Sequence, residues 1–387
     1  MGHQVHRFTK GLLATSCLLL SGAIGCSPST EHFPSEPLFD ALNELSAEQS
    51  ESIDDVLEQL FGTPEEPSLP QEIVSSGLLV LEQLKQAAGP VISHEVGVTQ
   101  GLYRRHCARC HGIAGDGRGP TALYQYPYPR DFTHGVFKWK RTYRDAKPTD
   151  EDLQRVIRRG VPGSAMPSFQ LLADEELAAL RQYLVYLSIR GELRRQLVWN
   201  AADEMPVDEV YDPMDAAEMS AIKANLLQPI VDAWASADGL VVETDIDLAR
   251  VIADSDSADR GRELFHSDRA GCAKCHGENG MGDTALLGSP VEDYDDWSRE
   301  RIESRSLADS SRSFPARRAL RPSLIGAKAR GGAEAIDLFR RAHQGIAGSP
   351  MGAVGPRRPG ESAALTDEEI AQLVAYLLTL LEAEEEA

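Results

Sequence analysis

Two short clusters of the 387-residue chain combine thiol and imidazole groups at the same spacing. The first reads RRHCARCHG over residues 104–112, and the second reads GCAKCHGEN over residues 271–279. In each, two cysteines lie three residues apart and a histidine follows the second. Such a pattern could bind zinc, form a redox-active disulfide or attach a cofactor covalently. The side chains concerned are Cys107, Cys110, His111, Cys272, Cys275 and His276.

The spacing favours covalent attachment of haem over the other two chemistries. Positions i, i+3 and i+4 share one face of a helical turn, so two thiols can reach the porphyrin vinyl groups while the imidazole reaches the iron. A zinc site needs four ligands, and the two cysteine pairs are 165 residues apart, counted from Cys107 to Cys272. A redox-active disulfide is typical of alternating strands and helices, which this sequence does not show. We therefore expect two covalent haem c groups, with His111 and His276 as proximal iron ligands.

A methionine in a loop of proline and glycine follows each cluster. Met166 lies in PGSAMPSF, and Met351 lies in AGSPMGAVGP. A thioether opposite a histidine fills the sixth position of a haem iron and raises its reduction potential. We expect Met166 and Met351 to take that position, which would make both irons electron carriers and not substrate-binding centres. His134 and His343 are the alternative ligands.

The elements around the two clusters occur in the same order. A helical pattern with an aromatic residue precedes each cluster, in VTQGLYRRH and ADRGRELFH, and a glycine-rich loop follows it. After each methionine comes an amphipathic helix, expected over residues 173–190 and 365–381. Thr366 and Glu369 form a capping box at the start of the second of these helices. This order resembles that of class I c-type cytochromes, twice over.

The resemblance implies an all-α fold of two tandem class I cytochrome c domains joined by an acidic, partly helical linker. We place the first domain at residues 95–192, the linker with short helices at 193–255 and the second domain at 256–387. In this family the first and last helices of a domain cross beside the haem. The aromatic candidates for the crossings are Tyr103 with Tyr183 or Tyr186, and Phe265 with Tyr376.

A basic segment lies between the first cluster and its methionine. Residues 124–144 read YQYPYPRDFTHGVFKWKRTYR. In class I cytochromes this part of the chain surrounds the haem propionates, and cationic or N–H donors there would hydrogen-bond the carboxylates. Arg130 and Trp139 are therefore the candidate propionate contacts. The alternative is a solvated loop.

The first residues resemble a bacterial lipoprotein signal. A short positive start precedes an apolar stretch from Leu12 to Ile24, about half of the ~20 residues that a bilayer span needs. The stretch ends in SGAIGC, so Cys26 would be the lipidated first residue of the mature protein; an ordinary cleaved signal is the alternative. We assign residues 1–26 to the signal. Residues 27–94 are rich in Ser, Pro, Glu and Asp, which predicts an acidic, partly disordered tether. Within it, IVSSGLLVLEQLKQ at residues 73–86 could form a short helix packed on the first domain.

The net charge of the chain indicates which kinds of macromolecule it can bind. The chain has 60 Asp and Glu against 39 Lys and Arg, a formal net charge of −21. This charge disfavours nucleic acid and favours a redox partner with a basic docking face. The sequence thus predicts an exported electron carrier, not an enzyme. It would be a dihaem cytochrome c, tethered by lipid on the periplasmic side of a bacterial membrane, that relays single electrons between a donor and an acceptor. The alternatives are the haem c subunit of a larger oxidase or dehydrogenase complex, and a dihaem peroxidase.

Overall fold

Helices make up the regular structure of the chain. The computed structural model describes residues 32–34, 40, 43–91, 100–282, 314–315, 317–319, 321–326 and 330–383. Across these ranges the β-bridges, Gly62 with Pro67 and Thr142 with Val241, are isolated. The expected all-α fold is confirmed. None of the helices in the described ranges has the length and apolar character that a membrane crossing requires.

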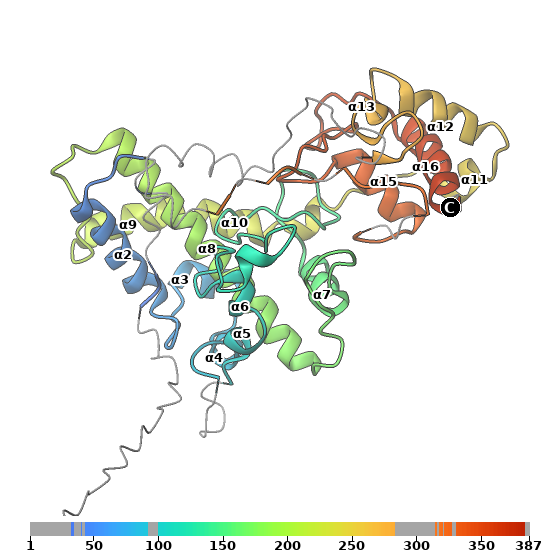
Figure 1. Ribbon diagram of the computed structural model, residues 1–387. Coiled ribbons are helices and arrows are strands. Elements are labelled where there is room, and N and C mark those ends of the chain that lie inside the picture. The colour runs from blue at the N-terminus through green and yellow to red at the C-terminus, as the bar shows by residue number, and fades with distance from the viewer. Residues whose placement is uncertain are drawn as a thin grey trace, which may run out of the picture.

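The helices form two hydrophobic cores, which lie side by side (Figure 1). The earlier elements are α2 (Ala47–Phe61), α3 (Gln71–Ser76), α4 (Leu81–Ala87), α5 (Leu102–His106), α6 (Ala108–His111), η1 (Ala122–Tyr124), α7 (Asp150–Arg159) and α8 (Asp174–Glu204). The later ones are α9 (Ala216–Ile222), η2 (Lys223–Leu227), α10 (Gln228–Ala235), η3 (Ala237–Leu240), α11 (Leu248–Ala253), α12 (Ser257–His266), α13 (Cys272–His276), α15 (Ala335–Gln344) and α16 (Asp367–Glu382).

The long helix α8 is the centre of the first core. Every residue from Tyr183 to Gly191 is buried, because α2, α4, α5, α7 and α10 all pack on this helix. The helix continues past residue 192, the expected end of the domain, to Glu204. Gly191 does not stop it. Its missing side chain instead admits a neighbouring loop, since a Cβ at this position would lie 2.4 Å from the Cα of Thr133.

Residues 43–91 are a packed helical segment, not part of the partly disordered tether predicted over 27–94. Helix α2 begins with a capping box on Ser46 and buries one face against α8, where the hydroxyl of Tyr186 donates to the carbonyl of Phe61 at 2.5 Å. The exposed positions of this helix carry Glu48, Glu51, Asp55 and Glu58, so the acidic composition of the segment does not exclude an amphipathic helix. The buried apolar residues of α2 are Ile53, Val56, Leu57, Leu60 and Phe61.

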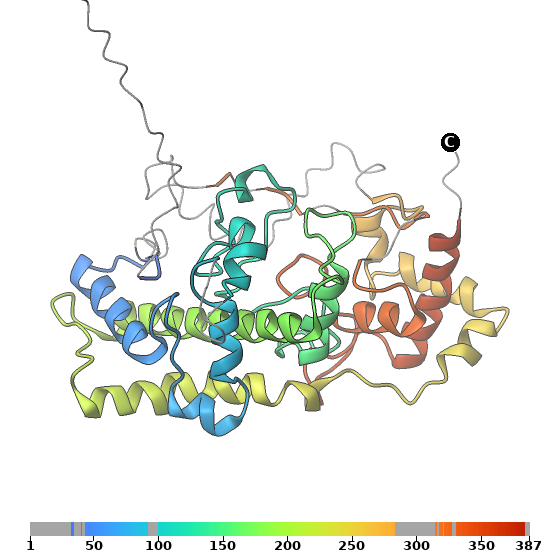
Figure 2. The same ribbon diagram turned by 90° about the horizontal axis from the view of Figure 1, so that it is seen from below.

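The expected linker, residues 193–255, is largely helical and packs on both cores: its elements up to α10 pack on the first, whereas Val242 and α11 pack on the second. Its elements α9, η2 and α10 form one continuous run beside α8 (Figure 2). The π-helical turn η2 ends two residues before Pro229, which has no N–H and crowds the preceding turn. The wider turn lets the helix continue through the proline. Leu227, Val231 and Trp234 bury the apolar side of this run.

In the second core the first and last helices cross at a glycine. Phe265 of α12 lies edge-on to Tyr376 of α16, with the ring centroids 5.4 Å apart, as the sequence predicted. Gly261 allows the two backbones to approach at the crossing, because a Cβ there would lie 2.1 Å from the carbonyl oxygen of Gln372. The second core therefore depends on a position that has no room for a side chain.

Replacing Gly261 by alanine should destabilise the second domain. The added methyl group would meet a backbone carbonyl that cannot rotate away, so the helices must separate at a cost of roughly 1–3 kcal/mol. Denaturant unfolding measures this loss. Gly239→Ala is the matched control, because a Cβ at Gly239 would have no atom within 4 Å. An equal, small effect of both substitutions would contradict the close-approach explanation.

The start of α16 should make stability depend on pH through Glu369. Its carboxylate contacts Arg269 at 2.6 and 2.9 Å and accepts the N–H of Thr366, and the hydrogen bonds from Arg269 lower the pKa of Glu369 from 4.5 to about 2. Because the folded pKa is depressed, this stabilisation is complete above the unfolded value and is lost as the pH falls towards 2.

Glu369→Gln should remove that part of the acid dependence. Thermal melts of the parent and variant proteins across this pH range measure the difference between them. The parent protein should lose its advantage over the variant as the pH falls. A difference that stays constant with pH would show that the carboxylate does not supply the linkage.

Candidate functional site

The first cysteine cluster lies where α5 meets α6. The N–H of His111 bonds to the carbonyl of Cys107 at 2.9 Å, so Cys107, Cys110 and His111 occupy one helical turn and share a face, as the spacing predicted. Cys107 packs against the first core, and the Sγ of Cys110 accepts a hydrogen bond from Nε2 of Gln125 at 2.9 Å.

Tyr103 joins this cluster to the closing helix α8. Its ring lies 5.0 Å from that of Tyr183, centroid to centroid, and its hydroxyl donates to the carbonyl of Gly112 at 2.9 Å. Burial raises the pKa of Tyr103 well above its ordinary value, so the hydroxyl keeps its proton and remains a donor. The aromatic crossing expected in the first domain is thus present, and it holds the end of the turn that carries the first cysteine cluster.

A backbone carbonyl fixes the orientation of the His111 ring. Nδ1 lies 2.9 Å from the carbonyl oxygen of Arg130, which can only accept, so Nδ1 carries the proton and Nε2 keeps its lone pair. The ring also stacks on Phe132, with centroids 4.5 Å apart. Burial lowers the pKa of His111 to about 4, so the imidazole is neutral at neutral pH. A neutral ring with a fixed tautomer is the form in which histidine binds a metal.

The second cluster repeats this arrangement on α13. Cys272 packs against the second core, and Nδ1 of His276 lies 3.2 Å from the carbonyl oxygen of Pro322. The same acceptor chemistry again leaves Nε2 of the histidine with its lone pair. Two clusters that belong to separate cores therefore present their imidazoles in the same way.

The two methionine loops share one backbone structure. Each follows a helix that ends at a glycine of positive φ, 66° at Gly160 and 67° at Gly345. The N–H of the next residue donates to the carbonyl of the methionine, at 3.2 Å in the first loop and 3.1 Å in the second. In the first loop the hydroxyl of Ser164 accepts the N–H of Met166 and donates to the carbonyl of Val161, and Ser349 makes the same two bonds with Met351 and Ile346. The matching residues are Val161 and Ile346, Ser164 and Ser349, and Met166 and Met351.

Sequence reasoning missed this shared loop, although its signal is present. Aligned on the glycine, residues 160–166 read GVPGSAM and residues 345–351 read GIAGSPM. The prolines beside the methionine differ between the copies, whereas the glycines and the serine that shape the loop are the same. Met351 is therefore presented by the same kind of loop as Met166, although proline follows Met166 and glycine follows Met351.

The two alternative ligands have other neighbours. His134 Nε2 lies 3.5 Å from a carboxylate oxygen of Asp131. His343 is only 3% exposed, and its ring packs between Tyr143 and Phe339 at centroid distances of 5.7 and 5.8 Å. The structure thus places His343 in the core, at the contact between the two domains.

The candidate propionate contacts lie in that same contact. Trp139 faces the guanidinium of Arg341, 5.7 Å from the ring centroid, and Gly331 also lies against it. Arg130 supplies the carbonyl for His111, and its guanidinium lies beside Gly348 of the second methionine loop. A role for either residue towards the propionates stays a prediction. The predicted lipidation site, Cys26, lies outside the described residues.

The donor groups at each site fit haem c. Burial raises the pKa of the Cys107 thiol to about 12 and that of Cys272 to about 11, so both thiols keep their protons. Protonated thiols can add to vinyl groups, a neutral imidazole can bind iron through Nε2, and a thioether suits the opposite position. These groups recur in both domains at matched positions.

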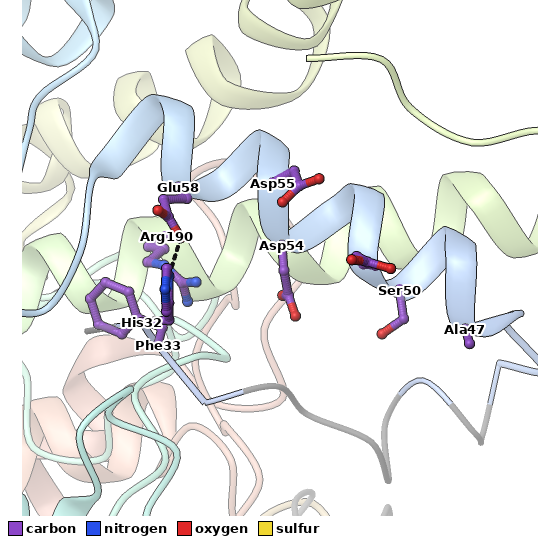
Figure 3. A pocket seen from close by; sticks show the side chains of 9 residues that line it. His32, Phe33, Ala47, Ser50, Asp54, Asp55, Glu58 and Arg190 are labelled. Carbon is purple, nitrogen blue, oxygen red and sulfur yellow. Dashed lines mark hydrogen bonds and ion pairs between the residues drawn. The ribbon is translucent and has the colours of Figure 1, made fainter. Parts of the chain in front are cut away.

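A separate hollow of about 470 Å³ lies beside α2 (Figure 3). Its walls carry Asp54, Asp55 and Glu58 of α2 and Arg190 of α8, and Nδ1 of His32 lies 2.7 Å from a carboxylate oxygen of Glu58. Its lining includes none of the cysteines, histidines or methionines of the two clusters. We therefore place the functional sites at the clusters and not in this hollow.

Comparisons with known proteins match the two clusters separately. The family model for cytochrome c matches residues 258–381, and the model for cbb3-type cytochrome c oxidase subunit III matches residues 96–184. A search of curated proteins gives no match. Among solved structures, a chain of the reducing HAO-like protein complex of Kuenenia stuttgartiensis matches with 23% sequence identity and a TM-score of 0.47. The match covers 79% of this chain and 97% of that chain. Each matched family range contains one cysteine cluster, its histidine and its methionine.

Replacing Gly345 by alanine should open the second site. A Cβ there would lie 2.4 Å from the carbonyl oxygen of Met351, so the loop must move. Gly360→Ala is the matched control, because Gly360 also has positive φ but a Cβ there would meet nothing within 4 Å; both share a strain of about 1–2 kcal/mol. Carbon monoxide binding to the haem-loaded protein reports an open iron. A second site that stays closed in Gly345→Ala would contradict the loop's role.

Proposed function

Since this chain is a class I c-type cytochrome with two tandem domains, we propose that each domain binds one haem c and that the protein relays single electrons between two redox partners. Haem c supplies reversible one-electron exchange at its iron. Cys107 and Cys110 would hold the first haem, and Cys272 and Cys275 the second. The chain's own part is to fix the ligands and exclude water, which sets the reduction potentials.

The observation that carries this proposal is the agreement between the two sites. In both, a backbone carbonyl directs Nε2 of the histidine, at 2.9 Å from Nδ1 of His111 and 3.2 Å from Nδ1 of His276. In both, the same glycine–serine loop presents the methionine, Met166 or Met351. Two irons that each have both axial positions filled exchange electrons and do not bind substrate.

The distribution of charge supports two different partner surfaces. Residues 95–192 carry 15 Lys and Arg against 11 Asp and Glu, so the first domain is basic within an acidic chain. Residues 256–387 carry 17 Lys and Arg against 23 Asp and Glu. A partner with a basic face suits the second domain, whereas an acidic face suits the first. Opposite charge on the two partners would keep the entry and exit of electrons on different domains.

The N-terminal sequence supports export and a lipid anchor at Cys26, on the periplasmic side of a bacterial membrane. The match of residues 96–184 to an oxidase subunit family supports a second candidate, in which the chain is a fixed haem subunit of a larger complex. Purification from mild detergent separates the two. A free carrier elutes alone, whereas a subunit elutes with its complex.

Haem content and carbon monoxide binding test the proposed function. The matured protein should hold two haems, and replacing both cysteines of one cluster by serine should leave one. Neither iron of the parent protein should bind carbon monoxide, because both methionines fill their positions. Met166→Ala should open the first iron and Met351→Ala the second. An iron in the parent protein that binds carbon monoxide would favour the peroxidase alternative over the electron carrier.

A further inference from the structure

Each methionine loop is held by an arginine of the other domain. Arg144, from the first domain, donates from Nη1 to the carbonyl of Met351 at 2.7 Å and from Nη2 to the carbonyl of Ser349 at 3.0 Å. Arg330, from the second domain, donates from Nη2 to the carbonyl of Gly163 at 3.0 Å. The contact between the domains therefore includes both of the loops that carry the methionines.

Arg144 binds the second methionine loop at a carbonyl that also takes part in the hydrogen bond closing the loop. The carbonyl of Met351 also accepts the N–H of Ile346 at 3.1 Å, which closes the loop. Nη1 of Arg144 lies 3.4 Å from the carbonyl of Gln344 at the end of α15. A guanidinium is a planar, permanently charged fork of donors, and its hydrogen bonds are stronger than neutral ones. One side chain thus ties together the end of α15, the turn and the methionine.

The surroundings of Arg144 belong to both domains. The ring of Tyr143 lies edge-on to His343 of α15, with centroids 5.7 Å apart. Nε2 of Gln344 donates to the carbonyl of Lys140 at 3.0 Å. These contacts join the segment that carries Arg144 to α15. The same segment is fixed to the first domain, because Nε of Arg141 donates to a carboxylate oxygen of Asp152 in α7 at 2.9 Å. A shift of the first domain is therefore transmitted through this segment to the guanidinium and the second methionine loop.

We propose that Arg144 is a positioning residue for the second haem site. It sets how firmly Met351 is held towards the iron, and it couples the ligation and reduction potential of that site to the first domain. The inference rests on the proposed function, because it requires Met351 as an iron ligand.

Loss of the Arg144 guanidinium should lower the reduction potential of the second haem, for two reasons. A looser thioether raises the potential less. Removal of a positive charge near the site makes the reduced iron less favourable. Both lower the potential of the second haem and leave the first haem, whose loop Arg144 does not hold, close to its parent value.

The test compares Arg144→Gln, Arg144→Lys and Arg357→Gln in the full haem-loaded chain. Arg357 is the matched control, because it also joins the two domains, through Asp145 at 3.0 Å, without holding the loop. Stopped-flow carbon monoxide binding and a redox titration that resolves the two haems are the readouts. Arg144→Gln should bind carbon monoxide at the second haem at least about tenfold faster, since it loses charge-assisted hydrogen bonds. Its second haem should titrate at a lower potential.

Arg144→Lys keeps the charge but loses the fork, so it should fall between the parent protein and Arg144→Gln, while Arg357→Gln should match the parent. Met351→Ala, measured alongside, separates two kinds of failure. If Met351→Ala opens the second iron but Arg144→Gln behaves as Arg357→Gln does, the positioning role is wrong. If Met351→Ala leaves the second site unchanged, Met351 is not its ligand, and the proposed ligation and this inference both fall.

Discussion

The bond between each cluster histidine and a backbone carbonyl is the constraint on which the rest of the structure depends. An imidazole is held in one tautomer and one orientation when its outer nitrogen donates to a fixed acceptor, so the chain returns to the ring after leaving the helical turn. In the first domain it returns 19 residues later, and in the second 46 residues later. The lengths differ, but both returns reach Nδ1 of the histidine. The start of the first return passes close to the turn itself, since a Cβ at Gly119 would lie 2.5 Å from the carbonyl oxygen of Ala108.

Features fixed by local sequence were predictable. The capping box of Thr366 and Glu369, the closing helix α16 and the aromatic crossings all follow from spacing, and the structure has each of them. The order of cluster, loop, methionine and helix was also sufficient to recognise two domains, which the family matches confirm. Such features concern groups that lie near one another along the chain or repeat at a fixed helical period.

What could not be predicted depends on contacts between distant segments. Helix α2 lies in a segment that reads as a tether because Ser, Pro, Glu and Asp dominate it, yet five apolar residues on one face of the helix dock it on α8. The end of α8 lies beyond residue 192 because these same neighbours cover it. The basic segment 124–144 was assigned to the haem surroundings from the order of elements alone. Its contacts with the second domain depend on how two separately folded cores meet, which no local pattern encodes.

The extension of α8 makes the two cytochrome units unequal as modules. The second unit is built around its own pair of crossing helices, whereas the first shares its central helix with an N-terminal helical segment and with the run through α10. A gene fragment cut at the edges of the first family match would end inside α8 at residue 184. It would lose the buried residues Leu193, Leu197 and Val198 of that helix together with α2 and α4, which pack on it. Recombination or duplication could therefore transfer the second unit by itself. The first unit would have to be transferred together with the helical segment 43–91 and the run through α10.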